Sequence, residues 1–147
     1  MIRKITFLAI IASILVSITS CKKSTELMVV GKWLIDDVGL PYARPGAYWE
    51  FDASGVLTLY LNPKGTKNGV IKGEWKIKKV MLRRYIEITM TEIIGELEEI
   101  DAREMTLTGT WRIDFLNNRE MGIVRIDCPT CETEGKSYLR RDFTKIK

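Results

Sequence analysis

The chain contains no histidine. Histidine is the commonest general base near neutral pH and the commonest zinc ligand, so its absence excludes Ser-His and Cys-His nucleophile pairs and the histidine-containing zinc sites. An enzyme would have to work with carboxylates. The acidic clusters do not favour this, because Asp36 and Asp37 end a candidate strand and the acids within 96–101 surround Leu97 and Ile100 as a solvated edge would. We therefore expect no catalytic residues, no cofactor and no metal.

The chain also has little net charge once its first residues are set aside. The whole sequence holds 23 basic and 19 acidic residues. Without Arg3 and Lys4, which precede the cleavage site argued below, 21 basic residues face 19 acidic ones and the excess is +2. No basic stripe interleaved with aromatics is present, so nucleic acid is not an expected partner. The lysines within 76–79 are interpreted as the solvent face of a strand.

The apolar run near the N-terminus is too short for a permanent membrane span. Two positive charges in residues 1–4 precede an uncharged stretch from Ile5 to Cys21, which has 17 residues. A spanning helix needs about 20 apolar residues. A short basic head before such a run is instead the pattern of a secretory signal.

The end of this run resembles the bacterial lipobox: Ile18-Thr19-Ser20-Cys21 has an aliphatic residue, two small residues and then the cysteine that receives lipid. The resemblance implies cleavage before Cys21 and acylation of its thiol and its new amino group. Several acyl chains hold a protein on a bilayer far better than one. An ordinary signal peptide or an uncleaved anchor are the alternatives. The expected organisation is a signal peptide over 1–20, a lipidated tether over 21–29 and one domain over 30–147.

Residue 22 bears on the destination of the lipoprotein. In enterobacterial lipoproteins an aspartate at this position retains the protein at the inner membrane, and the chain has Lys22 instead. By that resemblance the protein is expected in the cell envelope, anchored by its lipid to the outer membrane.

Apolar and polar residues alternate with a period of two along most of the mature chain, which is typical of half-buried strands. The clearest run is Met105 to Phe115, in which one face carries Met, Leu, Gly, Trp, Ile and Phe. A short helical turn is expected over 24–30. Strands are expected at 31–37, 47–52, 56–61, 70–78, 82–91, 93–101, 104–116, 119–127 and 137–145, separated by Asn-, Asp-, Gly- and Pro-containing turns. Such strands suit an all-β fold that is either an up-and-down barrel or a sandwich. Because closure would remove exposed strand edges, we predict a single antiparallel up-and-down barrel of about eight strands.

Three short motifs resemble the lipocalin-like lipoproteins of Bacteroidota. Gly31-Lys32-Trp33 matches the Gly-x-Trp that opens lipocalins and their calycin relatives, and the phrases at 49–57 and 73–77 follow in the family's order. The resemblance covers most of the mature chain. It implies a meandering barrel whose interior can hold one small molecule. It does not identify the ligand, because this fold has many functions.

The resemblance also gives Trp33 a partner. A first-strand tryptophan in calycins is covered by an arginine near the C-terminus, which combines stacking with hydrogen bonds. Arg141 is the candidate here because it shares a strand face with Phe143, and Arg140 is the second choice. We expect Trp33 itself to plug the floor of the barrel.

The expected function is non-catalytic binding of a small, partly apolar ligand. The connection from Val38 to Ala47 is rich in Pro and Gly and joins the first two strands, where lipocalins place a lid. Its Tyr42 and Arg44 offer a stacking surface and a charge, and Trp75 and Trp111 complete the candidate ligand-binding set, although inward tryptophans are also typical of a core. Because many inward side chains are large, we predict a small pocket that opens near Tyr42 and Arg44. The space for it is expected beside the inward glycines Gly73 and Gly109. The alternative is a protein-interaction or inhibitor module that uses loops at the barrel mouth.

Cys128-Pro129-Thr130-Cys131 is a CxxC motif with three interpretations. A zinc site needs about four ligands, and with no histidine and with Cys21 acylated only carboxylates remain to complete it. A thioredoxin-type redox pair is expected beside a βα turn, whereas this motif falls between strands. We favour the third, a small disulfide between Cys128 and Cys131 in an oxidising compartment.

Overall fold

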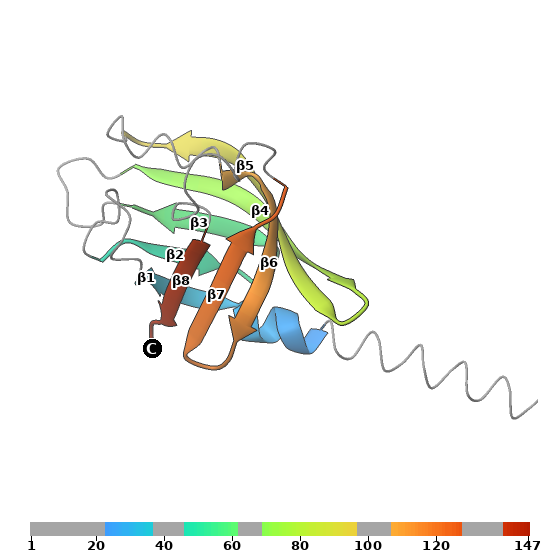
Figure 1. Ribbon diagram of the computed structural model, residues 1–147. Coiled ribbons are helices and arrows are strands. Elements are labelled where there is room, and N and C mark those ends of the chain that lie inside the picture. The colour runs from blue at the N-terminus through green and yellow to red at the C-terminus, as the bar shows by residue number, and fades with distance from the viewer. Residues whose placement is uncertain (1–22, 37–45, 62–68, 97–106, 128–139) are drawn as a thin grey trace, which may run out of the picture.

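The structure is a computed structural model that describes residues 23–36, 46–61, 69–96, 107–127 and 140–147. Eight strands close into one antiparallel barrel in the order in which they occur along the chain. The strands are β1 (Gly31–Ile35), β2 (Tyr48–Phe51), β3 (Val56–Tyr60), β4 (Val70–Val80), β5 (Arg83–Ile94), β6 (Gly109–Leu116), β7 (Glu120–Arg125) and β8 (Arg140–Lys145). The predicted all-β up-and-down barrel is therefore confirmed (Figure 1).

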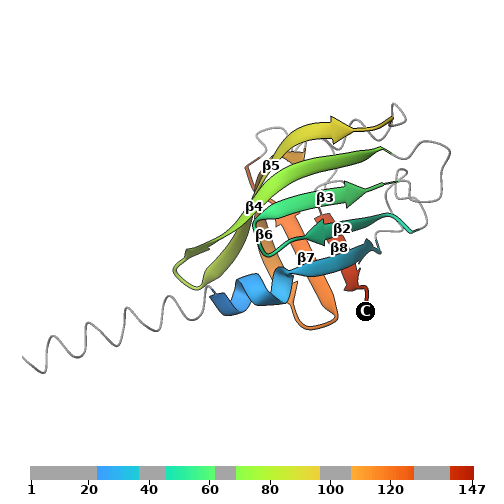
Figure 2. The same ribbon diagram turned by 180° about the vertical axis from the view of Figure 1, so that it is seen from behind.

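The two ends of the barrel differ. At one end a helix over 23–29 precedes β1, and short turns join β2 to β3, β4 to β5 and β6 to β7. We call this the helix end. The other end is where β1, β3, β5 and β7 end and β2, β4, β6 and β8 begin, and we call it the loop end (Figure 2). Within the part of the chain that the structure describes, no helix is long and apolar enough to cross a bilayer.

Inward side chains of all eight strands form one core. Alternation with period two turns one face of each strand to the barrel axis, and burial of that apolar face is the main stabilising contribution. Aromatic rings pack directly on one another: Trp49 lies 5.1 Å from Phe143, and Phe51 lies 5.4 Å from Trp75 in an edge-to-face arrangement. The described interior is therefore filled by side chains at the helix end and through its middle.

Two expectations about the strands are wrong, one about a strand limit and one about a buried face. A separate strand was expected to start at residue 93, but β5 continues to Ile94 and is followed by Gly95, whose φ is +79°. The rest of that predicted strand, from 97, lies outside the described residues. Phe115 was expected on the buried face. A register shift between Ile113 and Phe115 turns it outward, where it is 37% exposed and its ring covers Gly122.

The inward glycines do not leave the expected space. A Cβ at Gly73 would lie 2.5 Å from the carbonyl oxygen of Thr89, because the register shift between Lys72 and Gly73 brings β5 close. A Cβ at Gly109 would lie 2.6 Å from the carboxylate of Asp127. Both glycines therefore serve a close approach of neighbouring groups, and a cavity must be sought elsewhere.

Candidate functional site

Trp33 plugs the helix end of the barrel. Its side chain is fully buried, and its Nε1 donates a hydrogen bond to the carbonyl oxygen of Val29 at 2.6 Å. Lys145 covers the ring: its Nζ lies 4.9 Å from the ring centroid and donates to the carbonyl oxygen of Met28 at 2.9 Å. The helix over 23–29 is thus fastened to β1 and β8 by one indole and one ammonium group.

A cation of the last strand covers Trp33, but the residue predicted from the sequence is wrong: the cation is Lys145, not Arg141 or Arg140. Lys145 is the direct Cα partner of Trp33, whereas Arg141 is paired with Ile123 on β7, four residues or about 13 Å further along β8. Arg141 is 4% exposed, and its Nη1 donates to the carbonyl oxygen of Arg140. Continuing the alternation one step past Phe143 would have found Lys145.

Gly31 has a steric role beside this lysine. Its φ is +133°, a conformation that favours glycine, and a Cβ there would lie 2.8 Å from Cε of Lys145. The Gly-x-Trp spacing therefore places the residue that makes room for the lysine two positions before the ring that the lysine covers. Burial lowers the pKa of Lys145 below its usual value.

Two candidate ligand-binding tryptophans are core residues. Trp111 is fully buried, and its Nε1 donates to the carbonyl oxygen of Leu107 at 3.0 Å. Trp75 is 7% exposed, and its Nε1 donates to the carbonyl oxygen of Asp52 at 3.0 Å. Both indole N–H groups are occupied by backbone acceptors, so these rings offer a ligand little more than an edge.

Trp49 differs from the other three tryptophans. It is fully buried on β2, opposite Trp33 and Leu59, yet among the described residues its Nε1 has no hydrogen-bond acceptor. A buried N–H without an acceptor costs about 1–3 kcal/mol. Trp49 is the second residue of β2 counted from the loop end. A water or a bound molecule would supply the missing acceptor. Because Trp49 is the direct Cα partner of Trp33, that acceptor would lie in the middle of the barrel wall, one residue from the loop end of β2.

The remaining candidate residues lie outside the described part of the chain. Tyr42 and Arg44 belong to the β1–β2 connection at the loop end, and Cys128 and Cys131 belong to the β7–β8 connection at the same end. Cys21 precedes the helix over 23–29 by two residues. Among the described residues, no group of three or more potential metal ligands comes together.

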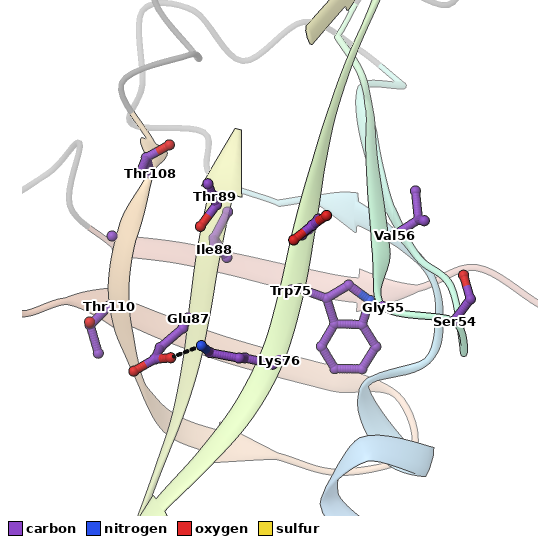
Figure 3. Close-up of a pocket in the computed structure, with 12 residues that line it drawn as sticks. Ser54, Gly55, Val56, Trp75, Lys76, Glu87, Ile88, Thr89, Thr108 and Thr110 are labelled. Carbon is purple, nitrogen blue, oxygen red and sulfur yellow. Dashed lines mark ion pairs between the residues drawn. The ribbon is translucent and has the colours of Figure 1, made fainter. Parts of the chain in front are cut away.

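Sequence reasoning missed a trough on the outer wall of the barrel. Its volume is about 590 Å³, and it crosses β3, β4, β5 and β6. Thr108 and Thr110 line one side, and Ser54 and Val56 line the opposite side (Figure 3). Outward side chains of β4 and β5 form its floor, including an ion pair between Lys76 and Glu87. Outward residues are hard to assign from sequence, because alternation separates the two faces without saying which outward face is concave.

The Lys76–Glu87 ion pair sets the charge of the trough floor. The carboxylate of Glu87 lies 2.9 Å from Nζ of Lys76 and 3.1 Å from Nζ of Lys78. The hydrogen bond from Lys76, and then that from Lys78, lowers the pKa of Glu87 below its usual value of 4.5. The floor therefore keeps its carboxylate ionised in mild acid.

Glu87→Gln is expected to weaken the dependence of stability on acid pH. A carboxyl group whose pKa is lowered by folding adds stability above its unfolded pKa, near 4.5, and that stability is lost as the pH falls through the folded value. The effect is small because the pair is exposed. Melting temperatures between pH 3 and 6 should fall less steeply in the variant than in the wild type. Equal slopes would show that the pair contributes nothing to folding.

Comparison of the chain with protein-family models, with curated proteins and with solved structures finds no match in any of the three. The class of the protein therefore rests on the structure alone. It is a closed eight-stranded antiparallel barrel, one end of which is plugged by a tryptophan. A barrel of this size is filled by side chains or holds one small molecule. Function has to be argued from the site rather than the fold.

Proposed function

We propose that the protein is an envelope lipoprotein whose barrel binds a small, partly apolar ligand at its loop end, without catalysis. The lipid attached to Cys21 would hold it on the outer membrane, as the pattern Ile18-Thr19-Ser20-Cys21 and the lysine at position 22 favour. A disulfide between Cys128 and Cys131 would clip the β7–β8 connection. The resemblance to lipocalin-like lipoproteins supports the same assignment.

The observation that carries the proposal is the unsatisfied indole N–H of Trp49. Buried donors are almost always paired, and an exception calls for a water, an ion or a ligand. The ring is packed against Phe143 at 5.1 Å and Phe51 at 6.1 Å, so a molecule that accepts from Nε1 meets an apolar wall beside its polar contact. A small molecule with one acceptor and an apolar body fits these neighbours.

The filled interior limits the depth of such a site. Helix-end and mid-barrel positions are occupied by large inward side chains: Trp33, Phe51, Leu57, Trp75, Trp111 and Met121. A ligand would therefore occupy a shallow pocket at the loop end rather than a deep cup. The proposal includes Tyr42 and Arg44 of the β1–β2 connection as ligand contacts, as predicted from the sequence.

Native mass spectrometry of the protein extracted from the envelope in mild detergent tests the proposal. We expect a small molecule to remain bound to a substantial fraction of the wild type. Trp49→Phe keeps an aromatic ring but removes the donor, and it should lower the bound fraction. Because Trp111 is equally buried but has a backbone acceptor, Trp111→Phe serves as the matched control and should retain the ligand if it folds.

A wild-type protein that carries no small molecule under conditions that preserve its fold would contradict the ligand proposal. The second candidate would then lead, a protein-interaction or inhibitor module. The trough of about 590 Å³ favours it, because hydroxyl groups and an ion pair line an open surface over an otherwise solid barrel. Cross-linking in intact cells should then capture a partner that is lost when Thr89→Arg fills the trough.

A further inference from the structure

The tip of the β4–β5 hairpin exposes three consecutive apolar side chains. Val80 is 47% exposed, Met81 89% and Leu82 96%. Met81 has a positive φ of 55°, which places the residue in the tight turn itself. Single exposed apolar residues are common on protein surfaces, but a contiguous group at the end of a projecting element indicates a contact surface.

Positive charge surrounds this tip. Lys79 precedes it, and Arg83 and Arg84 follow it. None of the three forms an ion pair within the described part of the chain, whereas Lys76 and Lys78 share the single carboxylate of Glu87. No acidic residue occurs from 75 to 86. The apolar tip therefore has a cationic border, a combination that suits the interface of an anionic lipid bilayer.

The hairpin projects from the barrel wall. The register of β4 with β3 ends at Glu74, and that of β5 with β6 ends at Tyr85. From Lys76 to Val80 the first strand of the hairpin has no ladder partner in β3, and these five residues extend about 16 Å. Figure 1 shows the tip standing clear of the barrel at the helix end.

The same end of the barrel carries the proposed lipid anchor. Figures 1 and 2 show the start of the helix over 23–29 beside the hairpin, and a hollow of about 360 Å³ is shared by Lys23 and Leu27 of the helix and Lys76 of β4. Cys21 is two residues before Lys23, so its Cα lies within about 8 Å of the helix start. The lipid and the hairpin tip therefore leave the molecule close together.

We propose that the tip of the β4–β5 hairpin is a second membrane contact, inserting Val80, Met81 and Leu82 into the bilayer that holds the anchor. Lys79, Arg83 and Arg84 then contact anionic headgroups. The proposal rests on the lipid anchor at Cys21. Two attachment points fix an orientation that one attachment point does not. The helix end faces the bilayer and the loop end, with the proposed ligand site, faces away from it.

The test is a Met81→Trp variant of the full chain, purified in its acylated form. It is reconstituted in vesicles of phosphatidylethanolamine and phosphatidylglycerol with bromine on the upper acyl chains. Three native tryptophans are fully buried and Trp75 is 7% exposed, so subtracting the wild type isolates the introduced indole. Ile94→Trp is the matched control, because residue 94 is 41% exposed at the loop end of the same hairpin.

We expect bromine to remove most of the emission at position 81, because a tip in the interface lies about 5–10 Å into the headgroup and acyl boundary. Emission at position 94 should be unaffected. Combining Met81→Trp with Lys79→Gln, Arg83→Gln and Arg84→Gln should reduce the quenching. Replacing phosphatidylglycerol by phosphatidylcholine should reduce it in the same way.

The acyl mass of each sample is measured in parallel, which separates this proposal from the one on which it rests. If the protein is acylated and bromine quenches the emission equally at positions 81 and 94, the membrane contact is overturned and the anchor is left intact. If the protein carries no acyl mass, the lipid anchor is overturned. Quenching of position 81 on added vesicles then still tests whether the hairpin tip contacts the membrane. A blue shift at position 81 that follows protein concentration rather than lipid shows that a second copy covers the tip and overturns the proposal.

Discussion

Trp33→Ala is expected to remove most of the stability of the barrel. The substitution deletes a fully buried indole and its hydrogen bond to Val29 and uncovers the ammonium group of Lys145. Deleting a buried tryptophan costs about 3–5 kcal/mol, and a domain of this size has only about 5–15 kcal/mol in total. Urea denaturation followed by circular dichroism should show a midpoint shifted far below that of the wild type, with the helix over 23–29 released first.

The matched control for this loss is Leu82→Ala. Leu82 is 96% exposed, and surface substitutions of this kind change stability by no more than about 0.5 kcal/mol. If Trp33→Ala unfolds at the same urea concentration as Leu82→Ala, Trp33 does not plug the barrel and the account of the helix end is wrong.

Cys21→Ser is expected to abolish lipid attachment completely, because the serine hydroxyl cannot take the place of the cysteine thiol. Fatty-acid labelling should disappear and the domain should move to the soluble envelope fraction. Charges on Lys79, Arg83 and Arg84 would still give weak adhesion to anionic membranes, and this adhesion is screened by salt. The fractionation is therefore made after a high-salt wash.

The double variant Cys128→Ser, Cys131→Ser is the control for the loss of a cysteine. It should keep full lipid labelling and ligand binding. The loss of stability should be modest, because a disulfide that closes so small a loop stabilises a protein by an amount at the low end of about 2–4 kcal/mol. A Cys21→Ser protein that still incorporates fatty acid would contradict the lipobox assignment.

The closed barrel could be predicted from the sequence because every strand declares one apolar face. Trp111 and Ile113 on β6, and Ile86 and Ile88 on β5, are buried as their alternation predicts. Alternation alone suits a sandwich as well as a barrel; the barrel has the advantage that closure leaves no exposed strand edge. The same alternation predicted nine candidate strands, and the described residues form eight, because the start of the candidate at 93–101 belongs to β5.

Local breaks in the alternation could not be predicted. A bulge changes which side chains face inward without changing residue type, and this is why Phe115 faces solvent in a run that otherwise points to the core. The role of Gly73 is similar: its missing Cβ accommodates the backbone of Thr89 rather than a ligand. Glycine in a strand indicates that another group approaches the backbone closely, and only the folded structure shows which group it is.

The candidate site was predicted least well. Trp49 looks like any other inward tryptophan in the sequence, and it differs from Trp75 and Trp111 only because no described carbonyl meets its N–H. The hairpin tip was equally hidden. Val80, Met81 and Leu82 continue an apolar pattern, and their exposure follows from how far β4 extends beyond β3.

The indole N–H signals of the four tryptophans test the central claim most directly. They are recorded by nitrogen-15 correlation spectroscopy on the protein as isolated and again after its bound small molecules have been extracted. Trp33, Trp75 and Trp111 donate to backbone carbonyls and should keep their shifts in both samples. We predict that the Trp49 signal alone moves on extraction and returns when the extract is added back. Four identical signals in both samples would contradict ligand binding at this site.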